Sequence, residues 1–149
     1  MGWTRDDPPA APELEWPEGD ALREAYRAGQ AEAGTAASAL VQIVEHAATM
    51  PTAPGIRLRR AAIRHEGSWA AMLKLFDDGS TAELDDVTTL TRFRRHGLGT
   101  ALMHGAIRDA RDGGCDLVFL RADQRDWPAS WYQRLGFAPL GRQYVFTLT

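Results

Sequence analysis

The stretch Arg94-Arg95-His96-Gly97-Leu98-Gly99-Thr100 decides the fold, because the apolar pattern of the chain changes from strand-like to helical across it. After it, apolar residues recur at helical spacing at Met103, Ala106, Ile107 and Ala110. The first backbone N–H groups of a helix lack intrahelical partners, and the helix dipole places partial positive charge there. Glycines leave room at such a start and arginines add charge, so the stretch predicts a cradle for a diphosphate.

Two other glycine motifs do not fit this stretch. A dinucleotide-binding fingerprint needs a third glycine three residues after Gly99, where the sequence has Leu102. A P-loop ends in Gly-Lys-Ser/Thr, whereas the only lysine of the chain, Lys74, lies inside an expected strand. On these residues alone, one alternative remains: a tight turn that binds no ligand and whose arginines are solvated.

The patterning on both sides predicts an α/β chain of the α+β type, with a mixed, largely antiparallel twisted sheet flanked by helices. The expected order of elements is β-α-α-β-β-β-α-β-α-β-β. The first strand is expected at Glu13 to Trp16, and Asp77-Asp78-Gly79-Ser80 is a strong hairpin signal. Further strands are expected at 58–63, 69–76, 81–90 and 117–120, the last buried on both faces, and in a final hairpin ending at 144–148. Helices are expected from 20 to 29 or 34, from 35 or 38 to 47, after the glycine stretch, and over 128–135.

Length and composition indicate one soluble domain. The 149 residues are 44% hydrophobic and 25% charged, with a formal net charge of -3. We expect a flexible tail over residues 1–12, which are rich in proline, and a single domain over residues 13–149. No window is apolar enough to span a membrane, and the charge argues against a nucleic-acid partner. One cysteine, Cys115, allows no internal disulfide, no residues show metal-ligand spacing, and a cytoplasmic location is expected.

Two motifs together resemble the GNAT superfamily of acyl-CoA-dependent N-acyltransferases. The first is the R-x-x-G-x-G/A signature, present here as Arg94, Gly97 and Gly99. The second is Trp131-Tyr132-Gln133-Arg134-Leu135-Gly136-Phe137, which resembles the L-Y-x-x-L-G-F block of the family. A helix and an apolar strand separate the two motifs, as in the family fold, and good matching covers 83 to about 144. The resemblance implies a GNAT fold and acetyl-CoA as co-substrate.

The resemblance also implies which residues bind the co-substrate. The pantetheine arm would contact the backbone of the strand before the glycine stretch, and the pyrophosphate would lie on the stretch itself. The implied strand residues are Val87, Thr88 and Thr89, and the implied loop residues are Arg94, Arg95, His96, Gly97, Leu98, Gly99 and Thr100.

Catalytic candidates follow from the chemistry that such a transfer needs. Tyr132 stands at the position of a family tyrosine near the cofactor sulfur, and its phenol could protonate the departing thiolate. An ammonium must lose a proton before it attacks, and Glu83 and then Asp86 are the candidate bases. Because side chains alternate along a strand, these two carboxylates lie on opposite faces unless a bulge interrupts the register.

The acceptor implied by the resemblance is the primary amine of a small molecule or a peptide. The alternative is a non-catalytic CoA-binding or regulatory domain of the same fold, and a nucleic-acid binder using the arginines is a third hypothesis. The apolar edge from Tyr144 to Leu148 permits a homodimer.

Overall fold

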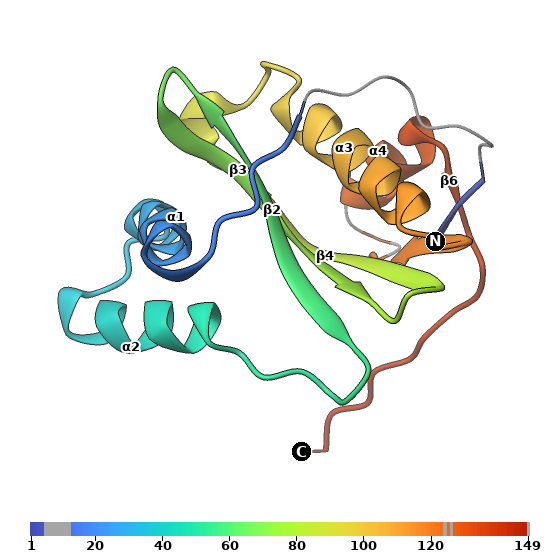
Figure 1. Ribbon diagram of the computed structural model, residues 1–149, viewed down its shortest axis with the longest axis horizontal. Coiled ribbons are helices and arrows are strands. Elements are labelled where there is room, and N and C mark those ends of the chain that lie inside the picture. Colours follow the sequence, from blue (N-terminus) through green and yellow to red (C-terminus); the bar gives the residue numbers. More distant parts are fainter. Residues whose placement is uncertain (5–12, 124, 126, 149) are drawn as a thin grey trace.

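The computed structural model describes residues 1–4, 13–123, 125 and 127–148 (Figure 1). In this part of the chain one sheet has the strand order β2-β3-β4-β5-β1-β6. Its strands are β1 (Gly2–Trp3), β2 (Arg57–His65), β3 (Ser68–Asp77), β4 (Thr81–Thr89), β5 (Leu117–Leu120) and β6 (Phe137–Ala138). The helices are α1 (Gly19–Glu32), α2 (Ala37–Ala48), α3 (Leu98–Asp112) and α4 (Trp127–Leu135). The predicted mixed sheet flanked by helices is therefore confirmed.

Strands β2, β3 and β4 form the antiparallel meander that the two-residue period predicted. The turn at 77–80 joins β3 to β4, as the sequence indicated. Asp78 Oδ1 accepts hydrogen bonds from the amides of Ser80, at 3.0 Å, and Thr81, at 2.8 Å. These bonds favour the ionised carboxylate and hold the pKa of Asp78 below its usual value. The turn thus fixes the register of the β3–β4 hairpin.

The two faces of the meander carry different helices. Leu73, Leu75 and Leu84 belong to the main core, together with Met103 and Ile107 of α3. The alternate residues of β2 and β3, including Ala62 and Met72, pack against α1 and α2 instead. Because side chains alternate across a strand, α3 and the α1–α2 pair lie on opposite faces (Figure 1).

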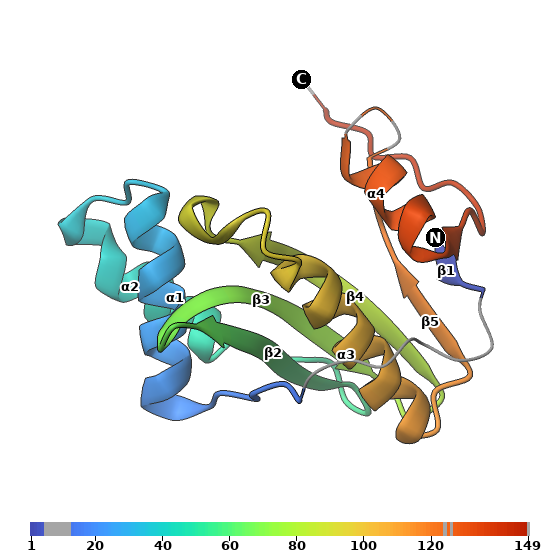
Figure 2. The same ribbon diagram turned by 90° about the horizontal axis from the view of Figure 1, so that it is seen from above.

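Strands β4 and β5 are parallel, with α3 as the connection between them. Their pairing runs only from Thr81 with Leu117 to Leu84 with Leu120. Beyond these pairs the strands separate, as Figure 2 shows. The edge of β4 from Asp85 to Thr89 that would face β5 therefore has no strand partner among the described residues. An open strand edge next to the start of a helix is a place where a ligand can reach backbone groups.

The N-terminus differs from the prediction. The flexible tail expected over residues 1–12 is wrong for residues 1–4, because Gly2 and Trp3 form β1 between β5 and β6. The Met1 ammonium donates a hydrogen bond to the Leu120 carbonyl at 2.8 Å, and the Trp3 ring is buried against Phe137. Burial of that ring and the sheet hydrogen bonds compensate for the entropy lost on ordering the segment. Residues 5–12 lie outside the described residues.

The segment from Glu13 to Trp16 is also less regular than predicted. It forms no extended strand and makes a single bridge to the edge of β2. Glu15 and Ala62 exchange two backbone hydrogen bonds, of 2.8 and 3.0 Å. The first strand of the chain is therefore β1.

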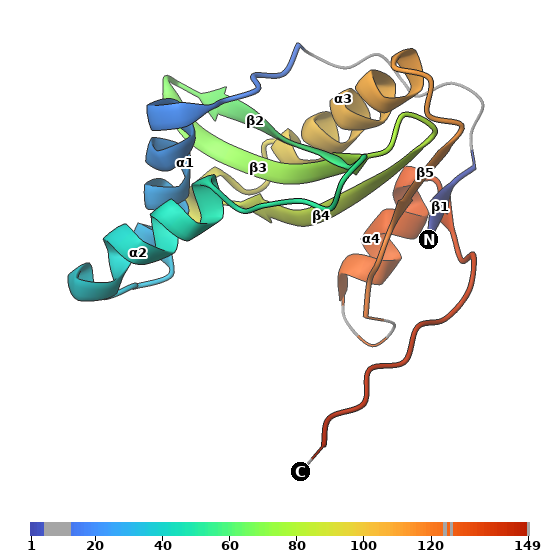
Figure 3. The same cartoon turned by 60° about the horizontal axis from the view of Figure 1, so that its bottom comes forward.

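The predicted terminal hairpin is wrong. Only Phe137–Ala138 forms a strand, and residues 139–148 have no regular structure. The place between β5 and β6, where a further strand could pair on both sides, is taken by β1. The side chains of Tyr144, Val145, Phe146 and Leu148 are exposed, and their segment extends away from the sheet (Figure 3). A homodimer through this segment stays a prediction.

Strand β5 is buried on one face instead of the two that were predicted. Val118 and Leu120 are buried in the core, but Leu117 is exposed and Phe119 is half-buried. The reason is that α3 covers one face of β5, whereas the α1–α2 pair packs on β2 and β3. A continuous apolar run is thus compatible with a strand that only one helix layer covers.

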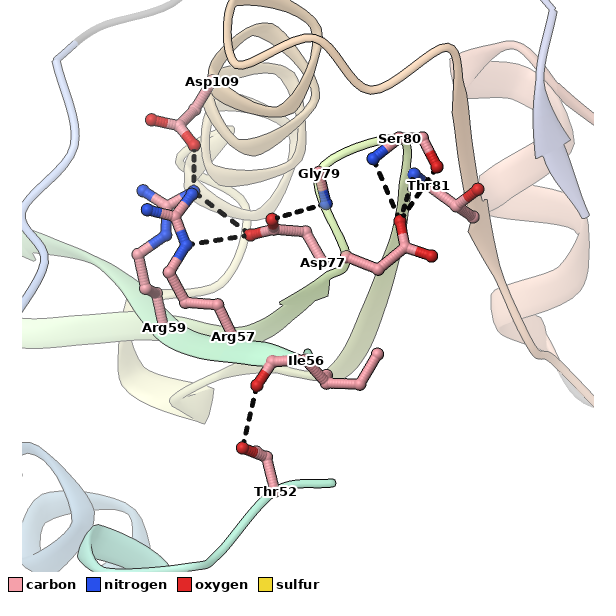
Figure 4. A network of polar contacts seen from close by, with 10 residues as sticks. Thr52, Ile56, Arg57, Arg59, Asp77, Gly79, Ser80, Thr81 and Asp109 are labelled. Atoms are coloured by element: carbon pink, nitrogen blue, oxygen red, sulfur yellow. Dashed lines mark hydrogen bonds and ion pairs between the residues drawn. The ribbon is translucent and has the colours of Figure 1, made fainter. Parts of the chain in front are cut away.

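We expect Asp77→Ala to lower the free energy of unfolding by about 2 kcal/mol. The buried Asp77 carboxylate accepts hydrogen bonds from Arg57 Nε and the Gly79 amide, both at 3.2 Å, and forms an ion pair with Arg59 (Figure 4). Its removal leaves Arg59, which is mostly buried, with one carboxylate partner fewer. Urea unfolding would measure the change. Asp112→Ala, at the exposed end of α3, should change stability by less than about 0.5 kcal/mol. Equal effects of the two variants would contradict this role of Asp77.

Candidate functional site

A bulge in β4 positions the acidic residues of the strand. Met72 pairs with Thr88, whereas Lys74 pairs with Asp85, so β4 has one more residue than β3 between these pairs. Asp86 occupies the bulge with a φ of 53°, a left-handed conformation that aspartate tolerates better than most residues. Its carboxylate lies 3.1 Å from Lys74 Nζ, on the face opposite to α3. Strict alternation would have placed Asp85 and Asp86 on opposite faces of the sheet. The bulge interrupts that alternation.

The loop after β4 leads its backbone into the start of α3. A short 3₁₀ helix at Thr91–Phe93 follows the strand, and Arg94 Nε donates to the Thr89 carbonyl at 3.3 Å. Arg95 and Gly97 both have left-handed backbones, with φ of 69° and 70°. Gly97 is the N-cap of α3, so no side chain caps the first turn. The amides of that turn are thus left for an external acceptor, as the sequence predicted.

A cavity of about 470 Å³ lies over this loop and the end of β4. We call it the cofactor cavity, after the co-substrate that the family resemblance implies for these residues. Its lining includes nearly all the residues that the family resemblance implied: Val87, Thr88, Thr89, Arg94, Arg95, Gly97, Leu98, Gly99 and Thr100. His96 is absent from the lining; its ring lies 4.8 Å from that of His65, between centroids. The structure thus brings strand and loop candidates together around one space.

Gly99 and Trp131 form the tightest part of the cofactor cavity. A Cβ atom on Gly99 would lie 3.3 Å from Thr89 Oγ1 and 3.5 Å from the Trp131 ring. The loop therefore approaches β4 and α4 so closely that the absence of a side chain is what keeps the space open. Trp131 lines the cavity but was not among the predicted contacts. The sequence feature that could have identified this contact is the position of Trp131 beside Tyr132 in the second motif.

Tyr132 lies in the core beside this cavity. Its side chain is 9% exposed, and its ring contacts those of Trp131, at 5.0 Å, and Phe137, at 6.1 Å. Burial raises the pKa of the Tyr132 phenol, and the negative charge of Asp85 raises it further. The phenol therefore keeps its proton throughout the neutral range, which a proton donor requires.

The phenolate absorbance of Tyr132 is expected to appear only above pH 10, the ordinary value for tyrosine. Because the folded pKa is raised, the stability from the neutral phenol is present below that pH and is lost as the pH rises through the folded pKa. Ultraviolet titration of the wild type minus Tyr132→Phe isolates this group. Asp85→Asn should move the transition to lower pH. A transition at or below pH 10 in the wild type would contradict the assigned environment.

The three acidic residues of β4 have different partners. Glu83 Oε1 accepts a hydrogen bond from Arg121 Nε at 2.7 Å, within the paired part of β4 and β5. Asp86 pairs with Lys74, and Asp85 acts on Tyr132 through its charge. Asp85 was available in the sequence but was not among the chosen bases. Only the structure identifies Asp85, through its place at the open edge of β4 and the effect of its charge on Tyr132.

Other chemistry finds little support in the described residues. Burial raises the pKa of the Cys115 thiol, with the charges of Asp77 and Asp78 adding to the effect, so it is a poor nucleophile. No group of three or more His, Cys, Asp or Glu side chains in the described part of the chain could hold a metal ion. Within the same part, none of the helices combines the length and apolar character that crossing a membrane requires.

Comparisons with known proteins identify the family. Residues 20–137 match the acetyltransferase (GNAT) family model. None of the curated proteins matches the sequence. The ribosomal-protein-alanine N-acetyltransferase of Brucella melitensis biovar Abortus 2308 has a TM-score of 0.69 at 16% identity, covering 91% of this chain and 98% of that one. The aminoglycoside N-acetyltransferase AAC(6')-Iy in complex with CoA has a TM-score of 0.64 at 14% identity, covering 92% and 99%.

A Trypanosoma brucei acetyltransferase has a TM-score of 0.59 at 21% identity, covering 91% of this chain and 99% of that one. At these identities the solved structures show the shared fold. The family match spans most of the chain and includes both motifs and the loop that joins β4 to α3. The chain therefore belongs to the GNAT family of acetyltransferases.

Proposed function

We propose that the protein transfers an acetyl group from acetyl-CoA to a primary amine, by direct attack with both substrates bound. The observation that carries the proposal is the cofactor cavity, where uncapped amides, two arginines and an open strand edge meet. Family membership adds support, since GNAT enzymes use acetyl-CoA. The named activities of the Brucella protein and AAC(6')-Iy also concern amine acetylation.

The residues of the cofactor cavity fit coenzyme A. The amides from Arg95 to Thr100 would hold the pyrophosphate, with Arg94 and Arg95 adding positive charge, and His96 would lie at the rim of that loop. The unpaired edge of β4 at Val87, Thr88 and Thr89 would hydrogen-bond the pantetheine arm. Bound acetyl-CoA supplies an activated acyl group and a thiol leaving group. The contribution of the chain is orientation and the placement of charge.

Proton transfer is assigned to Tyr132 and to the carboxylates of β4. The buried phenol of Tyr132 keeps its proton at neutral pH and would donate it to the departing sulfur. Asp86 lies at the bulge with its carboxylate on the face opposite to α3, and would accept the proton of the attacking amine. Glu83 is the second candidate base; both carboxylates have a cationic partner, but Asp86 is the more exposed of the two. A backbone N–H of β4 would stabilise the negative charge that develops on the carbonyl oxygen.

Calorimetry and a thiol-release assay test the proposal together. The wild type should bind coenzyme A and acetyl-CoA with measurable heat and should release thiol with at least one primary amine. Asp86→Asn and Glu83→Gln should separate the two candidate bases, because only loss of the true base should lower kcat by about 100-fold. Binding without thiol release from any amine would favour the non-catalytic CoA-binding domain. Absence of binding heat would contradict both.

A further inference from the structure

A second cavity of about 490 Å³ lies between α1 and strands β3 and β4. We call it the α1 cavity. It lies on the face of Met72 and Lys74, opposite to α3, and it shares one residue, Thr88, with the cofactor cavity. A molecule in the α1 cavity would therefore approach β4 from the face opposite to α3, at the residue where the two cavities adjoin.

About half of the α1 cavity wall is apolar. Small side chains from the helices face an aromatic ring and a thioether from β3. The apolar lining includes Ala25, Ala28, Ala47, Trp69, Met72 and Leu90. This part of the lining favours an apolar group, because a hydroxyl buried against it would need a hydrogen-bond partner.

Among the polar groups of the α1 cavity, a cation and an anion lie side by side. Lys74, the only lysine of the chain, has a side chain 18% exposed, and its Nζ lies 3.1 Å from Asp86 Oδ2. This is the one ionic contact of Lys74 among the described residues. An ammonium has three N–H donors, so Lys74 can bind a second anionic group. Asp86 is 56% exposed and can likewise bind a second cation.

A second positive charge stands next to Lys74. Arg60 is its cross-strand neighbour on β2, and donates hydrogen bonds to the Tyr26 hydroxyl at 3.3 Å and the Ala47 carbonyl at 2.7 Å. The Glu32 carboxylate, also in the lining, accepts a hydrogen bond from the Thr91 amide. The charged groups of the lining are thus one ammonium, Lys74, and the carboxylates of Glu32 and Asp86, and a free amino acid carries a complement to each kind of charge.

We infer that the acceptor is a free amino acid with an apolar side chain. Its ammonium would pair with Asp86 beside Thr88, its carboxylate with Lys74 Nζ, and its side chain would lie against Trp69 and Met72. The inference rests on the proposed acetyl transfer and names its substrate class.

The reaction balances with the groups present. Asp86 takes one proton from the ammonium, the nitrogen lone pair forms the C–N bond, and the C–S bond breaks. The C–S electron pair leaves on the sulfur, which takes the Tyr132 proton, and the second proton lost by the amine nitrogen restores the Tyr132 phenol through solvent. Asp86 releases its proton to solvent, so each turnover yields one amide, one thiol and one proton. Because an N-acetyl amino acid has no ammonium, it no longer pairs with Asp86, and this favours its release.

Three matched acceptors test the inference: phenylalanine, phenylalaninamide and phenethylamine share one aromatic body and differ only in the carboxylate. For the wild type, kcat/KM for phenylalanine should exceed that for each of the others by at least about tenfold, or 1.4 kcal/mol. Lys74→Met should lower the ratio of kcat/KM for phenylalanine to kcat/KM for phenethylamine by about tenfold or more. Lys74→Arg should restore the preference. Arg142→Met, which removes an exposed cation elsewhere, should leave it unchanged.

The outcomes separate this inference from the proposed function. Faster turnover of phenethylamine than of phenylalanine by the wild type, or equal losses for both in Lys74→Met, would overturn the amino-acid acceptor and leave acetyl transfer intact. Transfer to an aminoglycoside or a peptide N-terminus but to none of the three probes would do the same. Failure of the proposed acetyl transfer would look different: coenzyme A would give no binding heat, and no amine would cause thiol release.

Discussion

Replacing Gly99 with leucine is expected to weaken the binding of coenzyme A by at least about 100-fold, or 2.7 kcal/mol. A Cβ atom alone would lie 3.3 Å from Thr89 Oγ1 and 3.5 Å from the Trp131 ring, so a longer side chain must enter the cofactor cavity or displace Trp131. Either outcome removes the space over the first turn of α3, where the amides would hold the pyrophosphate. Isothermal titration calorimetry would measure the dissociation constant.

A graded series keeps this prediction separate from misfolding. Gly99→Ala needs only a small shift of Thr89 and should weaken binding by about tenfold or less. The backbone of Gly99 is not in a left-handed conformation, so neither variant strains it. Circular dichroism and urea unfolding would show whether the leucine variant keeps its fold. A folded leucine variant that binds coenzyme A as the wild type does would remove the cofactor cavity as the binding site.

The middle of the chain was predictable because local and tertiary preferences agree there. Apolar residues at strand spacing predicted β2, β3 and β4. The Asp-Gly pair predicted the turn between β3 and β4, and Asp78 accepts hydrogen bonds from the amides of that turn. The stripe of Met103, Ala106 and Ile107 gave α3, because all three side chains are fully buried. In these segments the spacing of apolar residues along the chain matches the spacing of buried residues in the structure.

Both termini were mispredicted because their pairing is decided by competition between distant segments. Trp3 and the apolar residues from Tyr144 to Leu148 are both suited to a strand, and no local pattern says which of them lies beside β5. The structure places β1 there, and the C-terminal residues are left exposed. A propensity measured along the chain cannot rank two segments that compete for the same partner.

The part of the site formed by the backbone of the glycine loop was predictable. The part that depends on the strand register of β4 was less so. Gly97 and Gly99 mark the loop whatever the flanking side chains are, because positive φ and close approach both favour glycine. The face of Asp86 depends on a bulge that adds one residue to β4, and alternation alone assigns it to the wrong face. The position of Asp86 beside Lys74 in the α1 cavity follows from that bulge, so it was not visible in the sequence.

Tyr132→Phe is expected to lower kcat by about 100-fold and to leave the KM for acetyl-CoA within about threefold. The substitution keeps the ring that packs against Trp131 and Phe137 and removes only the hydroxyl, so the fold and the cofactor cavity should be retained. The departing thiolate would then have to leave unprotonated or take a proton from water, which raises the barrier for cleavage of the C–S bond. Steady-state kinetics with a primary amine acceptor, with Tyr144→Phe as the exposed control, would measure the effect.

The direction of the Tyr132 pKa gives this prediction a second readout. A raised pKa keeps the phenol protonated as the pH rises through the neutral range, so the wild type should show no loss of kcat from this group until above pH 10. Asp85→Asn removes one cause of the raised pKa and should move that loss to lower pH without abolishing activity. If Tyr132→Phe kept full kcat, the hydroxyl would serve packing alone. Protonation of the sulfur would then have to come from solvent through the open edge of β4, and the rate would no longer depend on Asp85.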